Sequence, residues 1–247
     1  MTCYFRPIDA CRGPGAMIVA VSGCMRRGLK IMWGKWIGCS VPTAARERFS
    51  EGQRGWAAIA DQPGLIGQVG GWDPATGRAH VLALWTDAAA YRRFMDERHD
   101  RVFAATGQGG GCSAIGTATG ETFLDMAGDA TDLAPALRSA TVLRVADCRL
   151  LPGREEHFLE AQREVWAPGM AAAGGMLAGT VTRLGDRRCL VTTLWSGPQA
   201  HDRYVAGHLP ALRARAGLQE DLHSMTGHLI SLEPDWRVLP ATAVTVG

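Results

Sequence analysis

The sequence lacks several features that would point to large partners. Among its 26 basic residues only Lys30 and Lys35 are lysines, no run of Lys and Arg exceeds two residues, and the net charge is +2. Such a chain offers no broad positive field to phosphate backbones, which argues against a nucleic-acid partner. No stretch approaches the roughly 18 apolar residues that span a bilayer, so no membrane segment is predicted.

Several chemical motifs are also missing. The seven cysteines include no C-x-x-C pair and no Cys/His cluster at metal-ligand spacing, which predicts a reduced, cytoplasmic protein without a metal site. Cys39 and Cys148 are expected to be buried thiols. There is no G-x-S-x-G, H-E-x-x-H or paired-carboxylate pattern, and the glycines at 70–71 and 109–111 do not form phosphate loops. Hydrolase and metalloprotease functions are therefore disfavoured.

What the sequence does contain is an internal duplication. At offsets of 109 or 110 residues, the positions Cys39, Phe49, Gln53, Trp56, Trp85, His99 and Gly107 recur as Cys148, Phe158, Gln162, Trp166, Trp195, His208 and Gly217. Matches that need at most a one-residue gap are hard to obtain by chance. Two similar units of about a hundred residues each are predicted.

Each copy predicts the same order of elements: strand, helix, strand, strand, helix, strand. The ranges are 31–39, 43–59, 65–72, 79–85, 87–106 and 113–124, then 140–148, 153–172, 176–184, 187–195, 198–216 and 224–232. Thr43 and Asp87 are expected to cap the two helices of the first copy. This α+β order is the ferredoxin-like unit, whose antiparallel sheet is covered by helices on one face only. We expect the second copy to cover the other face.

The predicted domains follow from the repeat. Residues 1–28 lie outside it and are expected to be a disordered leader or to precede the true start codon. Unit 1 is predicted over 29–126 and unit 2 over 138–240, with a small, polar, Pro-bearing linker at 127–137 and a tail at 241–247.

The first copy resembles a known superfamily. Its Cys39-x-Val-Pro, Gln53-x-x-Trp56, Gly70-Gly71-Trp72, Leu84-Trp85 and Phe94-Met95-x-x-x-His99-Asp100 patterns are similar to those of the dimeric α/β-barrel superfamily, and of antibiotic biosynthesis monooxygenase-like proteins within it. The second copy keeps the fold pattern but has Val181-Thr182-Arg183 in place of Gly70-Gly71-Trp72 and His208-Leu209 in place of His99-Asp100. The resemblance implies two tandem ferredoxin-like (βαββαβ) units whose sheets pack into one pseudo-dimeric α/β barrel, as a monomer or as a further homodimer.

The resemblance also implies classes of activity. The superfamily includes cofactor-free oxygenases of quinols or anthrones, haem-degrading oxygenases, cyclases and proteins without known activity, and fold alone does not choose among them. The leading hypothesis is a bacterial enzyme of secondary metabolism that acts on an aromatic or polyketide-like small molecule without a cofactor. Cyclisation or dehydration would use the same base. The alternatives are a haem protein, with His99 or His208 as axial ligand, and a non-catalytic ligand-binding module.

His99 is the predicted catalytic base, because a neutral imidazole can take a proton from a phenol or an acidic carbon. A structural histidine that fixes helix packing is the alternative. Asp100 is not expected to orient His99, since neighbours on a helix point about 100° apart.

The predicted substrate-binding set comprises Lys35, Gln53, Trp56, Gln68, Trp72, His80 and Trp85, with Trp166, Trp195 and His208 as equivalents in the second copy. If Gln68 and Trp72 face the barrel interior, they and Lys35 would form a polar set in an apolar chamber. Otherwise these side chains serve packing. Arg144 and Thr180 are expected at the positions of Lys35 and Gln68.

Overall fold

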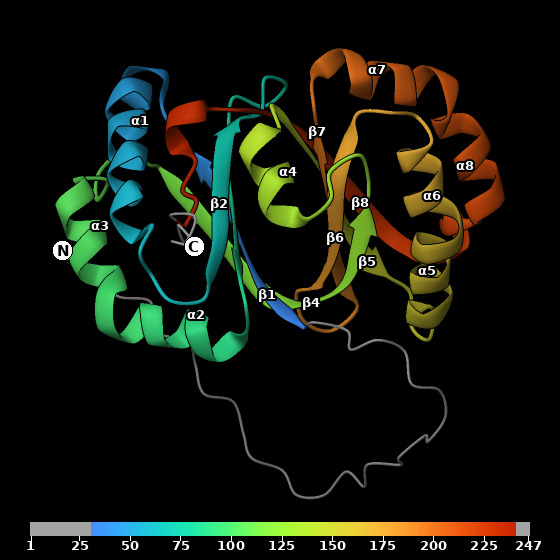
Figure 1. Ribbon diagram of the computed structural model, residues 1–247, viewed down its shortest axis with the longest axis horizontal. Coiled ribbons are helices and arrows are strands. Elements are labelled where there is room, and N and C mark those ends of the chain that lie inside the picture. The colour runs from blue at the N-terminus through green and yellow to red at the C-terminus, as the bar shows by residue number, and fades with distance from the viewer. Residues whose placement is uncertain (1–30, 241–247) are drawn as a thin grey trace, which may run out of the picture.

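The computed structural model describes residues 31–240, so the predicted leader and the tail at 241–247 lie outside the described residues. Figure 1 shows two helix-covered units side by side with their strands between them. No helix in the described part of the chain is long and apolar enough to cross a membrane.

The elements of the first unit lie close to their predicted positions. They are β1 (Met32–Ser40), α1 (Arg46–Gly55), β2 (Leu65–Trp72), β3 (Ala79–Trp85), α2 (Ala88–Phe94), α3 (Asp100–Thr106) and β4 (Ala114–Ala127). Short 3-10 turns at Thr43–Ala45 and Trp56–Ile59 flank α1, and a π-helical turn at Met95–His99 joins α2 to α3.

The second unit repeats this order. It contains β5 (Val142–Leu150), α5 (Glu155–Ala161), α6 (Ala167–Ala171), β6 (Met176–Arg183), β7 (Arg188–Trp195), α7 (Pro198–Gly207), α8 (Leu209–Ala216) and β8 (Leu222–Leu232). A π-helical turn at Gln162–Trp166 joins α5 to α6, and 3-10 turns occur at Leu218–Glu220 and Pro234–Trp236. The predicted α+β fold of two ferredoxin-like units is confirmed.

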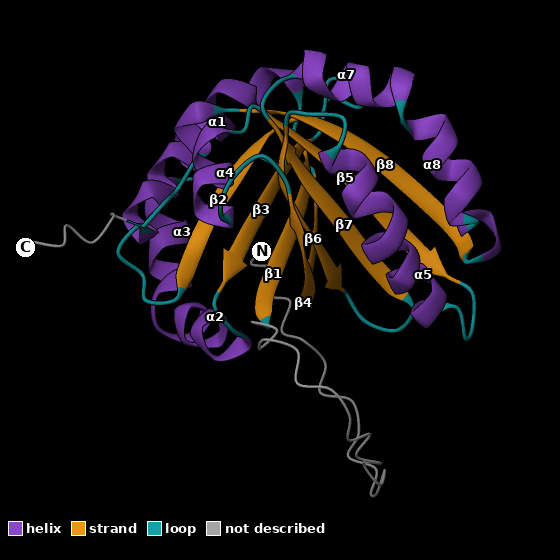
Figure 2. Ribbon diagram, turned by 45° about the vertical axis from the view of Figure 1, so that its right-hand side comes forward, coloured by secondary structure: helices purple, strands orange, loops and turns teal. Residues whose placement is uncertain are grey.

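The eight strands close into one antiparallel barrel in the order β1-β3-β2-β8-β5-β7-β6-β4. The two seams between the units differ in length. β4 pairs with β6 from Glu121↔Arg183 to Ala127↔Ala178, whereas β2 pairs with β8 only at Gly71↔Leu232 and Trp72↔Ser231. Val238 extends the shorter seam by exchanging backbone hydrogen bonds with Gln68. Figure 2 shows the strands fanning out beneath an outer layer of helices.

The expected linker carries an additional helix, α4 (Leu133–Ser139), which lies between the two units (Figure 1). Leu133, Ala136 and Leu137 are buried against barrel-lining side chains of both units, such as Val69 and Leu143. Helix α4 therefore covers the end of the barrel at which β1 and β5 begin, and it adds apolar contacts between the units.

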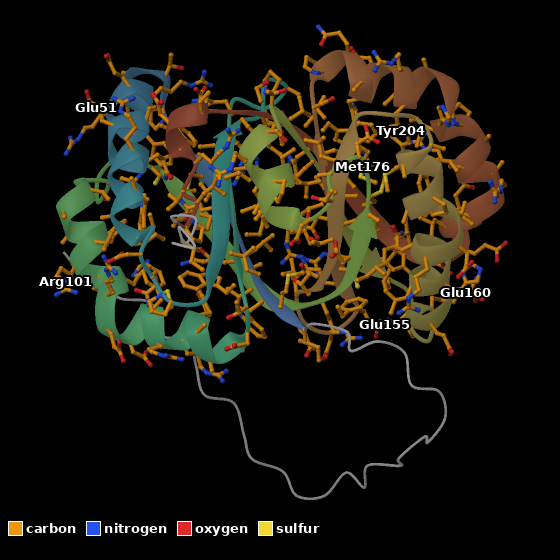
Figure 3. The ribbon with its side chains drawn as sticks, viewed as in Figure 1. Glu51, Arg101, Glu155, Glu160, Met176 and Tyr204 are labelled. Atoms are coloured by element: carbon orange, nitrogen blue, oxygen red, sulfur yellow. The ribbon has the colours of Figure 1, made fainter. Side chains whose placement is uncertain are left out.

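Strand parity sorts the side chains into two layers. On β1, Trp36 joins the cluster inside the barrel, whereas Trp33 packs beneath the helices. Figure 3 shows Glu51, Arg101 and Glu160 projecting from the outer surface of the helices, with Met176 and Tyr204 inside the second unit. Both faces of the sheet are thus buried.

Local predictions met mixed outcomes. Asp87 caps α2, with its Oδ1 accepting a hydrogen bond from the Ala90 N–H at 2.8 Å, as expected. The prediction for Thr43 is wrong, because it begins a 3-10 turn without a side-chain capping bond. Cys39 and Cys148 are free, buried thiols, and burial raises the pKa of each to about 12.

Candidate active site

Lys35 lies on β1 and points to the helices of the first unit, away from the barrel interior. Its side chain is 8% exposed, and its Nζ meets the Met95 sulfur at 3.6 Å and lies 5.6 Å from the centroid of the Tyr91 ring. No carboxylate within residues 31–240 pairs with it. Burial lowers the pKa of Lys35 to about 8, because a dry site disfavours the ammonium.

Gln68 lies in the same row of the sheet as Lys35. Both residues flank Ala83 of β3 in the register, so a small side chain separates two polar ones. This face lies beneath the helices, so of the two alternatives the outward one holds, and Lys35, Gln68 and Trp72 form no polar set inside the barrel. The β2 bulge after Leu65 sets this parity.

Several buried polar atoms of this layer have no hydrogen-bond partner among the described residues. They are Trp33 Nε1, Gln53 Oε1, Gln68 Nε2 and Trp85 Nε1. Buried polar groups in proteins are nearly always paired, and an orphaned one costs about 1–3 kcal/mol. The unpaired donors and acceptors of this layer are free to bond water or a ligand.

His99 closes the π-helical turn at the edge of this layer. Its side chain is 20% exposed and packs near Trp56, Phe94 and Phe103, at ring-centroid distances of 5.6, 5.8 and 6.1 Å. Burial lowers the pKa of His99 below its usual value; the bond to Asp100 opposes this shift and the Lys35 charge adds to it. His99 is thus poised as a neutral imidazole.

The expectation that Asp100 would not orient His99 is wrong. His99 Nδ1 and Asp100 Oδ1 are 2.9 Å apart. The π-helical turn widens the backbone at this point, which reduces the angle between neighbouring side chains. Because Asp100 is 84% exposed, the bond fixes the ring but adds little stability.

The predicted tryptophans occupy different places. Trp56 donates its indole N–H to Gln108 at 2.8 Å and lies beside His99. Trp85 stacks on Phe94 at 4.9 Å beneath α2. Trp72 packs instead on Phe49 and Trp236 in a separate apolar cluster.

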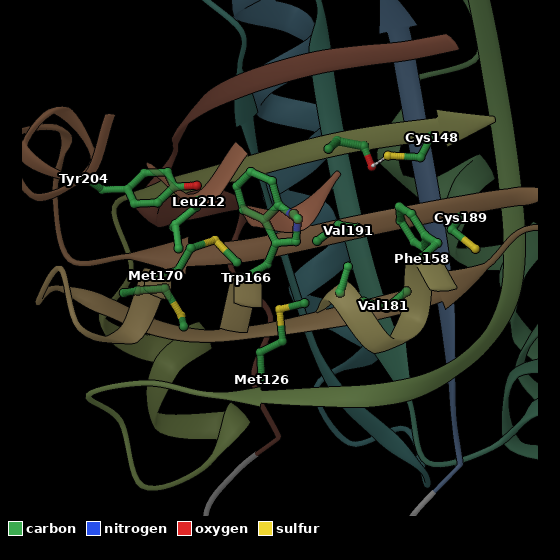
Figure 4. Close-up of a cluster of buried hydrophobic side chains, with 14 of the residues drawn as sticks. Met126, Cys148, Phe158, Trp166, Met170, Val181, Cys189, Val191, Tyr204 and Leu212 are labelled. Carbon is green, nitrogen blue, oxygen red and sulfur yellow. Dashed lines mark hydrogen bonds between the residues drawn. The ribbon is translucent and has the colours of Figure 1, made fainter. Parts of the chain in front are cut away.

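The second-copy equivalents lie in a more apolar layer. Trp166 and Trp195 belong to a large buried cluster together with Phe158, Met170 and Tyr204, shown in part in Figure 4. His208 lies at the junction of α7 and α8, and within the described residues its ring makes none of the aromatic or ionic contacts of His99.

His80, the remaining predicted residue, points into the barrel and belongs to a different site. It is 2% exposed and stacks on Trp36 at 4.9 Å, and its ring lies 4.6 Å from that of His228 on β8. His228 Nδ1 is 3.0 Å from Asp73 Oδ2. The donor atoms of Asp73, His80 and His228 all lie within 4.8 Å of one another, so these residues could hold a metal ion.

The electrostatics of this group follow from its burial. Burial lowers the pKa of His80 to about 4, and the neighbouring His228 contributes. Burial alone would raise the pKa of Asp73, but hydrogen bonds from His228, Thr76 and the Ala75 N–H hold it below its usual value. Asp73 is therefore an anion beside imidazoles.

Sequence reasoning missed Asp73 and His228. Asp73 reads as a hairpin-turn residue, and its Oδ1 does accept a bond from the Ala75 N–H at 3.0 Å. His228 lies in a strand of the other unit, 155 residues from Asp73. The available signal was period-two parity, which places His80 and His228 on inner faces once the register is known.

A cavity of about 320 Å³ lies beside these residues, at the end of the barrel opposite α4. Its lining includes Trp36, Arg78, His80, Arg188 and His228. Glycines on β1 and β4 leave this space open, because Gly38 and Gly116 pair in the register and carry no side chain. The barrel is thus filled beside α4 and open at the other end.

Comparisons with known proteins agree with this architecture. Residues 33–118 match a family described as a domain of unknown function, DUF4937. An uncharacterised protein of Bacillus subtilis, YdbC, is 33% identical over 75 residues, which cover 28% of this chain and 61% of YdbC. The chain thus spans less than two thirds of that relative.

Solved structures extend the likeness to both units. A candidate monooxygenase of Lactobacillus acidophilus is similar over 84% of this chain and 96% of its own, with a TM-score of 0.65 and 13% identity. An anthrone oxidase-like protein is similar over 83% of this chain and 92% of its own, with a TM-score of 0.59 and 14% identity. At such identities the likeness is one of fold. The chain therefore shares the fold of these proteins, an α/β barrel built from two ferredoxin-like units, with both halves of the barrel supplied by one polypeptide.

Proposed function

We propose that this protein is a small-molecule enzyme that binds an aromatic or polyketide-like substrate between the sheet and the helices of its first unit. His99 acts as the base, and the reaction is oxygenation by O2 without a cofactor. The observation that carries the proposal is the buried amine of Lys35, which has no carboxylate partner within residues 31–240 and lies in the same layer as His99.

Lys35 supplies a charge where a substrate anion would form. A pKa of about 8 leaves its amine mostly protonated at pH 7, in a layer that lacks a protein counter-ion for it among the described residues. A buried charge of this kind is costly unless it is paired. An enolate or phenolate would complete the pair, and it would be stabilised more strongly than its neutral precursor.

His99 would take the proton that creates this anion. Its imidazole is neutral at pH 7 because its pKa is lowered, and Nδ1 is held by Asp100, so Nε2 is the accepting atom. For an anthrone-type substrate, the resulting carbanion carbon gives its electron pair to O2 and forms a C–O bond. Loss of the second proton from that carbon expels water and leaves a ketone, so one O2 converts a CH2 group to C=O plus water.

The aromatic side chains give such a substrate a place to bind. Trp56, Phe94 and Phe103 surround His99, and the orphaned donors Trp33 Nε1 and Gln68 Nε2 could bind oxygen substituents of a flat ring system. The cyclase or dehydratase alternative would use the same base and remains a prediction. So does haem binding through His99.

The non-catalytic alternative expects a barrel filled by side chains. The cavity of about 320 Å³ does not fit that expectation. A module that only binds a ligand would still fit, and catalysis therefore needs a direct assay.

The test is O2 consumption with 1,8-dihydroxyanthrone as probe, followed by the absorbance of its quinone product. We compare the wild type with His99→Gln, Lys35→Met and, as a matched control from the second copy, His208→Gln. Loss of a general base and of an anion-stabilising charge should each lower kcat/KM by about a hundredfold or more. The His208 variant should keep the wild-type rate.

Three outcomes would contradict the proposal. Equal rates for wild type and the His99 variant would exclude that base. A Soret band after haem reconstitution that is lost in the His99 variant would favour the haem alternative. Binding of the quinone product without any turnover would favour a ligand-binding module.

A further inference from the structure

We propose that Asp73, His80 and His228 form a binding site for a divalent transition-metal ion inside the barrel. The three side chains come from the β2–β3 turn, from β3 and from β8, so both units contribute. Their donor atoms lie within 4.8 Å of one another, and small rotations of the side chains would bring all three to one ion. This site is separate from the layer of Lys35 and His99 and does not rest on the proposed function.

β2 lies between β3 and β8, and its Gly71 pairs with His80 on one side and with Leu232 on the other. His228 lies four residues before Leu232, beyond the paired residues of the β2–β8 seam and next to Asp73. A Cβ on Gly71 would lie 1.9 Å from the Ser231 carbonyl oxygen. Only glycine allows the close approach of β2 and β8 at this position.

His80 carries the strongest sign of a missing partner. It is 2% exposed, and neither Nδ1 nor Nε2 has a hydrogen-bond partner among the described residues. A fully buried imidazole without any bond is a destabilising feature unless something binds it. Trp36 stacks on the ring with an interplanar angle of 13°, which restricts its orientation.

Asp73 and His228 are already arranged as ligands of one centre. Asp73 is 2% exposed, and its position is fixed because Oδ1 accepts from the Ala75 N–H. His228 Nδ1 lies 3.0 Å from Asp73 Oδ2, a separation typical of a hydrogen bond and also of two neighbouring ligands on one ion. The carboxylate could bind the ion directly or orient His228 from behind.

The chemistry of the set selects the class of ion. Two imidazoles and one carboxylate suit Zn²⁺, Co²⁺, Ni²⁺ or Fe²⁺ better than Mg²⁺ or Ca²⁺, which prefer oxygen ligands. Three protein ligands leave coordination positions open, and these would face the cavity of about 320 Å³.

The charges around the cavity are compatible with a bound cation. Arg188 is neutralised by Asp147, whose two oxygens accept from Nε and Nη2 at 2.9 and 2.6 Å. Arg78 also lines the cavity and would favour an anion at an open metal position. An anion held by Arg78 without any metal is the competing explanation.

The experiment uses the full chain stripped with a chelator and titrated with Co²⁺, whose visible bands report coordination, and with Zn²⁺ in a calorimeter. We expect one ion per chain. His80→Ala, His228→Ala and Asp73→Asn should each weaken binding by about tenfold to a hundredfold or more. The control is His223→Gln, because His223 is exposed on the same strand β8.

The possible results separate a metal site from the competing explanations. Absence of saturable Co²⁺ and Zn²⁺ binding, or equal binding by the wild type and the His80 and His228 variants, would overturn the site. Metal-independent binding of inorganic phosphate that is lost in Arg78→Gln would favour the anion explanation instead. If His80→Ala fails to fold by circular dichroism, Asp73→Asn keeps the shape of the site and serves as the deciding variant.

Discussion

The two units use the layer between sheet and helices differently. In the second unit this layer is one large apolar cluster around Trp195, Phe158 and Tyr204, seen in part in Figure 4. In the first unit the corresponding layer is split into two smaller clusters, and it also buries Lys35 and Gln68. The two copies of the fold thus fill this layer differently, one with a single large apolar cluster and one with two smaller clusters and a buried amine.

The register identifies the positions at which the copies differ. Lys35 and Arg144 both stand opposite the third strand of their unit, at Ala83 and Thr193. Gln68 corresponds to Gly179, and not to Thr180 as expected from the sequence, because β2 and β6 carry the same bulge at equivalent positions and stay in step: Gln68 stands opposite Ala83 and Gly179 opposite Thr193. Thr180 points into the barrel, where it bonds Thr192 at 2.7 Å.

The second unit is not wholly apolar. The His201 ring nitrogens and the Tyr204 hydroxyl are buried without partners among the described residues, and Arg144 is half-buried. What distinguishes the first unit is its almost fully buried amine in the same layer as a histidine that already has an orienting carboxylate. That difference is the reason why the proposed chemistry is placed in the first copy.

The largest expected effect is on stability, and it compares the packing of the equivalent tryptophans Trp195 and Trp85. Trp195→Ala should lower the free energy of unfolding by about 3–5 kcal/mol, because it removes a fully buried ring from the apolar cluster. It also removes the bond from Trp195 Nε1 to Thr193 Oγ1 at 3.0 Å. Trp85→Ala should cost less, because its Nε1 has no partner to lose. Urea denaturation of both variants measures this, and a larger loss for Trp85 would reverse the comparison.

A smaller effect of opposite sign is expected for Lys35→Met. The folded pKa of about 8 lies below the 10.5 of an unperturbed lysine, so the unfolded chain holds more protons between these pH values. Below pH 8 the Lys35 amine is charged in both the folded and the unfolded chain, so the folded wild type bears the full cost of burying an ammonium. The methionine variant avoids this cost and should be more stable than the wild type by at most about 3 kcal/mol. The advantage should disappear as pH rises from 8 to 10.5.

Thermal or urea unfolding from pH 6 to pH 11 would show this convergence. A variant less stable than the wild type at pH 7 would mean that the amine has a favourable partner, and it would remove the main support for the proposed active site. Arg144→Met is the matched comparison in the second unit, where a half-buried guanidinium should give a smaller gain.

The smallest effect concerns the caps of the equivalent helices α2 and α7. Asp87 caps α2 through Ala90, whereas the equivalent position of α7 is Gly197, which has no side chain to cap with. Asp87→Ala should cost about 1 kcal/mol, and Gly197→Asp should gain a few tenths. Gly197 has an extended backbone at φ −176°, so aspartate fits without strain. Unchanged melting temperatures for both variants would show that neither cap matters.

The sequence by itself determined the duplication, the order of the elements and, with small shifts, their bounds. Those features depend on local patterns, such as the apolar run 79–85 and the capping Asp87, which act over a few residues. It also identified Lys35, Gln53, Gln68, Trp85 and His99, which the fold places in or at the edge of one helix-covered layer.

Only the tertiary structure decided which face of each strand points into the barrel. Helices bury the outer face and the second sheet buries the inner one, so alternation of polar and apolar residues does not mark the inside. Asp73, His80 and His228 lie on the β2–β3 turn and on two strands of different units, and they meet because barrel closure sets β8 beside β2, at a seam whose close approach requires Gly71. The register of two distant strands creates this contact, so the spacing of the residues along the chain cannot predict it.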